Sequence, residues 1–157
     1  MKPKVYIETS VISYYTSKPS RDIIVAAQQQ LTIEWWDNYI QDFDVYVSPL
    51  VYDEISKGDL EASKRRISVI TDFKNLKITD NVFALANEYY KLLQLPDRAK
   101  ADAVHLSLAC IHIIDYLISW NCVHIVGARV RKMIETYNSK NGLFIPILCT
   151  PQELLEV

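Results

Sequence analysis

The sequence predicts an α/β fold, a three-layer α/β/α sandwich with a central parallel sheet of four to five strands. Two observations predict it: short apolar runs recur along the chain, and segments with helical spacing lie between them. Short runs that are rich in β-branched residues are typical of strands buried on both faces. Strands that alternate with helices favour a parallel sheet with helices on both sides.

The predicted strands are short apolar runs, each bounded by turn residues. In chain order they are KVYIETS at the start, DVYVS from Asp44, LKIT from Leu76, DYLIS from Asp115 and IPILC from Ile145. Runs of this length suit a strand and are shorter than an ordinary helix.

Apolar residues that recur every three or four positions predict the helices. They are Ile24, Ala27, Leu31, Trp35 and Tyr39; Val82, Leu85, Ala86, Tyr89 and Leu93; Val104, Leu108 and Ile111; and Val130, Met133, Ile134 and Tyr137. Start and stop signals agree with this assignment. Helices are expected to begin at Ser48-Pro49, Asp59 and Pro96-Asp97, and to end near Gly58 and Gly142.

Length and composition indicate one domain, residues 1–157, in a cytoplasmic protein. Lys and Arg number 17 against 19 Asp and Glu, and the formal net charge of −2 by itself gives no support to nucleic-acid binding. The three cysteines show no C-x-x-C spacing, which favours reduced thiols over disulfides or a zinc site. We expect no signal peptide, and no apolar run approaches the roughly 18 residues that a membrane span needs.

Four polar residues are predicted at one edge of the sheet. Ligands of open parallel sheets bind beyond the carboxyl ends of the strands. Glu8 closes the first strand, and Asn121 directly follows the fourth. Glu54 lies on the short helix after the second strand, at the margin of the stripe that faces the protein. Asp102 falls in the early turns of a later helix, whose dipole favours the ionised carboxylate.

Glu8, Glu54 and Asp102 would bring three negative charges together. Such charges repel one another, which raises pKa values and destabilises the fold unless a cation lies among them. A hard divalent ion with oxygen ligands, Mg²⁺ or Mn²⁺, is the natural solution. The ion keeps several waters, one of which can hydrolyse a phosphodiester while the ion neutralises charge on the phosphate. Each residue alone also has a plain interpretation, as a turn residue or as compensation for a helix dipole.

Four segments of the sequence resemble the PIN-domain family. They are VYIETSVISYYTSKPSRD, SPLVYDEISKGD, KADAVHLSLA and DYLISWNCVHI, which lie between residues 5 and 125. They resemble the first strand with its loop, the second strand with a Glu-bearing helix, the helix with the central Asp, and the fourth strand with the last site position. The segments occur in the order and spacing of the family.

The resemblance implies a metal-dependent endoribonuclease that hydrolyses RNA with Mg²⁺ or Mn²⁺. It places the catalytic residues and metal ligands at Glu8, Glu54, Asp102 and Asn121. Many small bacterial members are toxins of toxin–antitoxin pairs, so the resemblance also allows an antitoxin protein as a partner beside the RNA substrate. The family more often has Asp at the first and last of these positions, and Asn121 carries no charge. A catalytically weak PIN fold that binds RNA or a protein therefore stays the alternative.

Neighbouring residues are candidates for supporting roles. The hydroxyls of Thr9 and Ser10 could touch metal-bound water or phosphate, and a helix N-cap is an equal interpretation. His105 lies one turn from Asp102 and is expected to pack or to support the site rather than to act as a general base. Arg129 follows the site end of the fourth strand and is the best-placed contact for an RNA phosphate.

Two other features have plain interpretations. Cys122 and His124 form a C-x-H pair, but no further ligand has suitable spacing, so zinc is not expected. The helical segment of residues 23–43 is unusually aromatic. It is expected to serve mostly as core, with part of it available for a homodimer contact.

Other phosphate-handling folds lack their motifs here. A phosphatase of the haloacid-dehalogenase type needs an Asp nucleophile with a second Asp two residues on, whereas Glu8 is followed by Thr9-Ser10. A response-regulator receiver needs paired acids and a lysine besides its phosphorylated Asp, for which Asp80 is the only candidate. Neither G-x-x-x-x-G-K-[ST] nor G-x-G-x-x-G occurs.

Overall fold

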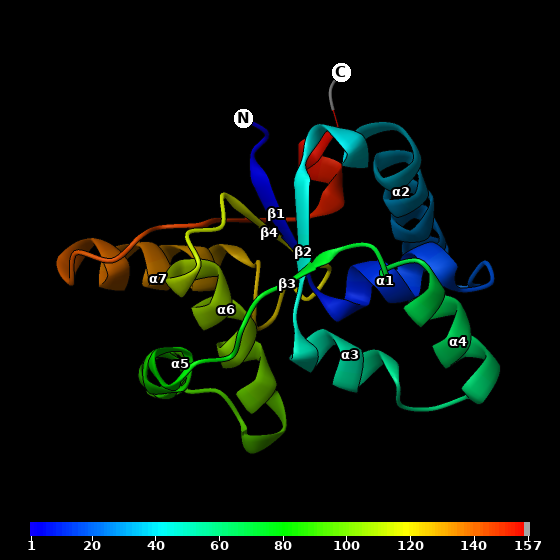
Figure 1. Cartoon of the computed structure of the whole chain (residues 1–157). Coiled ribbons are helices and arrows are strands. Elements are labelled where there is room, and N and C mark those ends of the chain that lie inside the picture. The colour runs from blue at the N-terminus through cyan, green and yellow to red at the C-terminus, as the bar shows by residue number, and fades with distance from the viewer. Residues whose placement is uncertain (156–157) are drawn as a thin grey trace.

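The computed structural model describes residues 1–155, and these residues have the predicted α/β fold (Figure 1). Their sheet has five strands in the order β3-β2-β1-β4-β5, and all neighbouring strands are parallel. The strands are β1 (Lys4–Ile7), β2 (Asp44–Val47), β3 (Lys74–Asn75), β4 (Tyr116–Ile118) and β5 (Ile147–Cys149). The last two residues of the predicted domain 1–157 lie outside the described residues.

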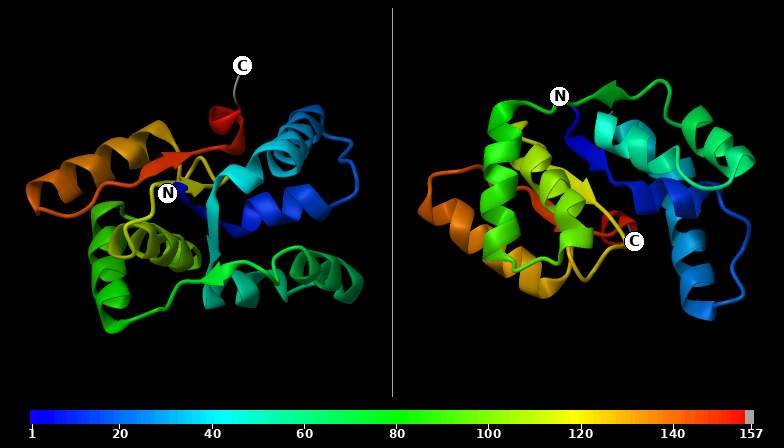
Figure 2. Two further views of the ribbon diagram at one scale, coloured as in Figure 1. Left: turned by 45° about the horizontal axis from the view of Figure 1, so that its top comes forward. Right: turned by 90° about the horizontal axis from the view of Figure 1, so that it is seen from below.

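Helices cover both faces of the sheet, which gives the predicted three layers. One side carries α1 (Thr9–Thr16), α2 (Ile23–Tyr39), α3 (Pro49–Ile55) and α4 (Leu60–Ser68), and the other carries α5 (Asp80–Leu92), α6 (Lys100–Ile111) and α7 (Ala128–Lys140) (Figure 2). Right-handed crossovers account for this division, because the chain moves outward from β1 to β3 and then returns toward β5. Short 3-10 turns lie at Ile40–Asp42, Asp97–Ala99 and Pro151–Leu154. No helix among residues 1–155 is long and apolar enough to cross a membrane.

The third strand lies earlier than predicted. The run from Leu76 was expected to form it, but β3 consists of Lys74–Asn75. The Leu76 N–H still donates to the Val47 carbonyl at 2.8 Å, so the chain leaves the sheet only after that bond. Thr79 then caps α5. The apolar run therefore becomes a connection, because the helix begins almost at once.

The helix starts agree with the sequence in two cases and differ in a third. Ser48 and Asp59 cap α3 and α4, each accepting a backbone N–H with its side-chain oxygen. The predicted cap at Asp97 is wrong. Asp97 begins a 3-10 turn, its carboxylate accepts from the Tyr90 hydroxyl at 2.6 Å, and α6 has no side-chain cap. The Lys100 N–H donates to the Asp97 carbonyl instead, so the turn leads directly into the helix.

The aromatic side chains of α2 belong to the core, as expected. Trp35 is completely buried, and Trp36 stacks on Tyr15 of α1 with ring centroids 4.3 Å apart. The strongly exposed apolar residues of this helix are Ile23 and Ile24, at its first turn. A homodimer contact on α2 stays a prediction, and its surface would be this first turn rather than the aromatic residues.

The strand order reverses beside β1, and this reversal locates the site. The chain leaves β1 toward β2, whereas β4 later pairs with the opposite edge of β1. Ligands of open parallel sheets bind in the crevice at such a point, outside the carboxyl ends of the strands. Ile7 lies opposite Ile118, and the Glu8 N–H donates to the Ile118 carbonyl at 3.1 Å. The segments that follow β1 and β4 therefore emerge side by side.

Candidate acidic site

Glu8 joins the ends of β1 and β4. It is 6% exposed, and its side chain caps α1 by accepting from the Ser10 N–H at 3.0 Å. The same oxygen, Oε1, also accepts from the hydroxyls of Ser10 and Ser119, the latter at 2.7 Å. Glu8 itself is thus the N-cap of α1, and the Ser10 hydroxyl, one of the two candidates for that role, supports the carboxylate.

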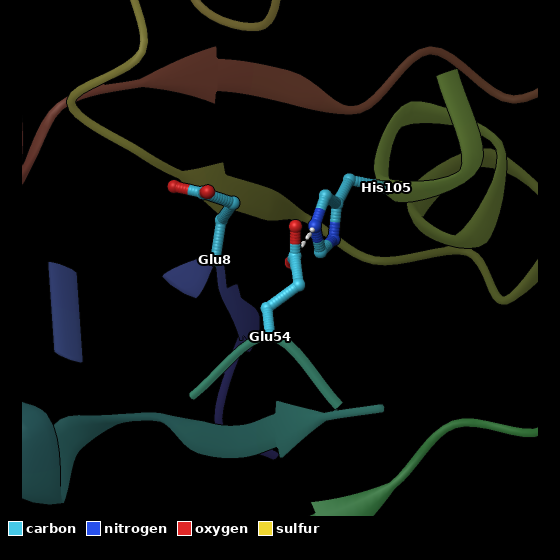
Figure 3. Close-up of side chains that lie close together, drawn as sticks. All are labelled: Glu8, Glu54 and His105. Atoms are coloured by element: carbon cyan, nitrogen blue, oxygen red, sulfur yellow. Dashed lines mark hydrogen bonds and ion pairs between the residues drawn. The ribbon is translucent and has the colours of Figure 1, made fainter. Parts of the chain in front are cut away.

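Glu54 reaches the site from the last turn of α3. Its Oε1 accepts from the Thr9 hydroxyl and from Nε2 of His105, each at 2.7 Å. Figure 3 shows the Glu54 carboxylate directed at the His105 ring, with Glu8 beside them. Ligand atoms of Glu8, Glu54 and His105 all lie within 4.8 Å of one another. The predicted supporting residues Thr9 and His105 therefore both act on Glu54.

The pKa values of Glu54 and His105 shift in opposite directions because the two side chains are in contact. Burial raises the pKa of Glu54, but the hydrogen bond and charge of His105 outweigh burial and leave that pKa lowered. Burial lowers the pKa of His105, but the hydrogen bond and charge of Glu54 outweigh burial and leave that pKa raised. A carboxylate can only accept, so Nε2 of His105 carries a hydrogen whether the ring is neutral or charged. That nitrogen has no lone pair for a metal while it contacts Glu54.

Asp102 lies in the first turn of α6 and faces the loop that follows β4. Its Oδ2 accepts from the amide nitrogen of Asn121 at 3.3 Å and contacts Nδ1 of His124 at 3.1 Å. Burial raises the pKa of Asp102, the charges of the two glutamates add to this rise, and the two nearby histidines oppose it. The pKa of Asp102 is thus raised, mainly by burial, whereas the helix dipole was expected to favour the ionised form. The repulsion that was expected among the acids contributes to the raised pKa of Asp102, but burial is the larger cause, and the pKa of Glu54 is lowered.

Asn121 organises the loop and faces the acids with its amide nitrogen. Its Oδ1 accepts from the His124 N–H at 3.0 Å, and its backbone carbonyl accepts from the N–H groups of Ile125 and Val126. A backbone N–H needs an acceptor, so this contact identifies the oxygen end of the amide. Asn121 lies beside Asp102 but presents a donor to it. Its role as a metal ligand stays a prediction that requires the amide to turn.

The loop of residues 121–127 brings His124 to Asp102, a contact that the sequence alone does not predict. An asparagine that accepts an N–H a few residues on is a common turn signal, and it could have placed His124 beside Asn121. Cys122 is exposed and belongs to no group of potential metal ligands within residues 1–155. Gly127 closes the loop, because a Cβ there would lie 1.9 Å from the Cys122 carbonyl oxygen.

The side chain of Arg129 forms its hydrogen bond with a residue outside the acidic site. It lies on α7, and its Nη2 donates to the Leu93 carbonyl, directly after α5, at 3.4 Å. It lines a groove with Leu92, Met133 and Tyr137. A phosphate contact by Arg129 stays a prediction.

The three carboxylates share one arrangement. In each, one oxygen accepts the hydrogen bonds described above, Oε1 in Glu8 and Glu54 and Oδ2 in Asp102, and the other accepts none from residues 1–155. Within residues 1–155, the side-chain nitrogen or oxygen that is fully buried and lacks a hydrogen-bond partner is Nε1 of Trp35. The unbonded carboxylate oxygens of Glu8, Glu54 and Asp102 are therefore not fully buried, and solvent reaches them. The carboxylates of Glu8 and Glu54 are close enough together to hold a cation between them. Asp102 is not in the group of potential ligand atoms within 4.8 Å of one another among residues 1–155.

Comparisons with known proteins add no relative. No family model matches the chain, and no curated protein matches its sequence. Fold and site define an α/β protein with a parallel sheet and an acidic site where the strand order reverses.

Proposed function

We propose that this protein is a metal-dependent nuclease of the PIN type, an endoribonuclease that hydrolyses RNA phosphodiesters with Mg²⁺ or Mn²⁺. One observation carries the proposal: Glu8, Glu54 and Asp102 each use one carboxylate oxygen for hydrogen bonds and leave the other open to solvent. The order of these residues along the chain also agrees with the PIN pattern that the sequence resembles.

The residues present fit a hard divalent ion. Mg²⁺ prefers oxygen ligands and is usually bound through a few carboxylates while it keeps several waters. The open oxygens of Glu8, Glu54 and Asp102 would be its ligands, and Asn121 could join them only by turning its amide. His105 would orient Glu54 without binding the ion. When bound, the ion would neutralise charge on a phosphate and acidify a water.

The chain also supplies hydrogen-bond donors beside the acids. The amide nitrogen of Asn121 and the ring of His124 lie against Asp102, and the His124 side chain is 21% exposed. Charged or polar donors suit the anionic oxygens of a phosphodiester. A polyanion could approach bare carboxylates only with a cation between them, so an RNA phosphodiester and a divalent ion are proposed together.

The alternative is a catalytically weak PIN fold that binds RNA or a protein. The orientation of Asn121 favours this alternative, because the fourth position presents no negative oxygen to a metal. The role of toxin, with an antitoxin as partner, is a narrower form of the proposal. A small antitoxin-like gene immediately upstream of this one would support it.

Cleavage of end-labelled single-stranded and hairpin RNA tests the nuclease. We expect internal cleavage with Mn²⁺ or Mg²⁺ and none with EDTA. Glu54→Gln and Asp102→Asn should each lose most activity, because each removes a charged ligand. Glu61→Gln is the matched control, since Glu61 is exposed and pairs with Lys64 on α4. RNA binding without cleavage in either metal would instead support the binding module.

A further inference from the structure

We propose that Ser48, Tyr6 and His105 are positioning residues, whose buried chain of hydrogen bonds orients the Glu54 carboxylate toward a divalent cation. The inference rests on the proposed function, because it gives Glu54 the role of a ligand. The three residues act through Glu54 and do not themselves bind the ion.

The chain of hydrogen bonds crosses three elements and is closed to solvent. Nδ1 of His105, on α6, lies 2.7 Å from the hydroxyl of Tyr6, on β1. That hydroxyl lies 2.8 Å from Oγ of Ser48, the N-cap of α3. All three residues are 0% exposed, so these groups must satisfy one another. The other ring nitrogen of His105 meets Glu54 at 2.7 Å.

The hydrogens of this chain have one consistent direction when the His105 ring is neutral. Nε2 donates to the Glu54 carboxylate, so Nδ1 must accept from the Tyr6 hydroxyl. The Tyr6 oxygen then accepts from the Ser48 hydroxyl. The Ser48 oxygen in turn accepts from the Val51 N–H at 3.3 Å. The bonds therefore point from the start of α3 to the carboxylate near its end, and each strengthens the next.

Two donors anchored in different helices hold Glu54 at a single oxygen. His105 approaches Oε1 from α6, and Thr9 approaches it from α1. A glutamate side chain has several rotatable bonds, and these two contacts select one orientation of its carboxylate. The oxygen left open is then always Oε2. Tyr6 contributes by fixing the rotation of the His105 ring, as outer partners do for the ligands of metal sites.

The stability of the fold alone does not require this chain of hydrogen bonds. Replacing both partners of a buried hydrogen bond by apolar groups of the same shape can be nearly neutral for folding. Tyr6 and His105 nevertheless meet in a core whose other buried residues are largely apolar. This chain of hydrogen bonds ends at the Glu54 carboxylate, and we infer that orienting this carboxylate is its role.

Calorimetric titration of the full-length protein with Mn²⁺ tests the inference. Tyr6→Phe removes one hydroxyl and keeps the ring. We expect the Kd for Mn²⁺ to rise by less than the about 10- to 100-fold that losing an outer partner of a metal ligand usually causes, because Tyr6 acts on Glu54 through His105. Tyr89→Phe is the matched control. Tyr89 is also 0% exposed and donates to Asn138 at 2.6 Å, outside this chain. The control should lower the melting temperature and leave the Kd unchanged.

Two variants of His105 give a second measurement if Tyr6→Phe does not fold. His105→Gln keeps a donor for Glu54 and should bind Mn²⁺ less tightly than wild type but more tightly than His105→Leu. Equal Kd values in wild type, Tyr6→Phe and both His105 variants would overturn the inference and leave the metal site standing. An equal loss in Tyr6→Phe and Tyr89→Phe would also overturn it, because general loosening would then explain both. A wild type that binds no Mn²⁺ would overturn the proposed function and this inference together.

Discussion

Glu8→Gln should stabilise the protein in the absence of divalent ions. Carboxylate oxygens of Glu8 and Glu54 lie within 4.8 Å of each other, and two unit charges at that separation repel by about 3.5 kcal/mol at an effective dielectric constant of about 20. Glutamine keeps an oxygen for the hydroxyls of Ser10 and Ser119. It loses a charge at the start of α1, which costs about 0.3–1 kcal/mol, and its hydrogen bonds are weaker. The net gain in unfolding free energy should be about 2 kcal/mol.

Thermal unfolding followed by circular dichroism checks this expectation. In EDTA the melting temperature of Glu8→Gln should exceed that of wild type by about 4–8 °C, at about 2–4 °C per kcal/mol for a protein of this size. Mn²⁺ at about 100 times its Kd should stabilise wild type by about 2.7 kcal/mol and the variant by much less, because the variant has lost a ligand. A lower melting temperature in EDTA, with an undiminished response to Mn²⁺, would refute the reasoning.

Three further predictions follow from the site and the surface. Asn121→Asp should preserve or increase RNA cleavage and tighten Mn²⁺ binding, because it adds a negative oxygen; weaker binding by titration would contradict this. The difference in unfolding free energy between wild type and His105→Gln should be largest between about pH 4.3 and 6.5. This difference should decrease as pH falls below that window, because the pKa of Glu54 is lowered in the folded state and protonation of Glu54 removes the interaction. The difference should also decrease above the window, as pH rises through the raised pKa of His105 and the ring loses its charge. Denaturant titrations across pH that show a constant difference would argue against the pairing. Finally, we expect a homodimer at micromolar concentration through the exposed Ile23 and Ile24, and light scattering that shows only monomer would end this idea.

The positions of the four site residues could be predicted from the sequence, because they depend on where elements end. Glu8 and Asn121 directly follow buried apolar runs, so they had to lie at the carboxyl edge of a parallel sheet. Glu54 and Asp102 lie on helices whose apolar stripes define which side faces the protein. Strand and helix periodicity were therefore enough to place Glu8 near Glu54, and Asn121 beside Asp102.

The internal contacts of the site could not be predicted, because they depend on side-chain orientation across elements. Periodicity does not show that His105 turns to Glu54 instead of Asp102, or that Asn121 presents its nitrogen. Tyr6 reads in the sequence as one more apolar strand residue, and Ser48 reads as a cap. Their contact depends on the packing of β1 against α3 and α6, which is tertiary information.

Gly127 allows the start of α7 to pack closely against the loop behind Asp102. Its φ of −67° is ordinary for any residue, so the glycine is required for space and not for backbone freedom. The backbone at the start of α7 lies directly against the Cys122 carbonyl and leaves no room for a side chain between them. Asn121 and His124, which contact Asp102, therefore belong to a loop that packs against the start of α7. The contacts of Glu8 and Glu54 involve no residue of this loop. The loop is nevertheless linked to Glu8 as well as to Asp102, because the Ser119 hydroxyl that donates to Glu8 also accepts from the Asn121 N–H at 2.9 Å.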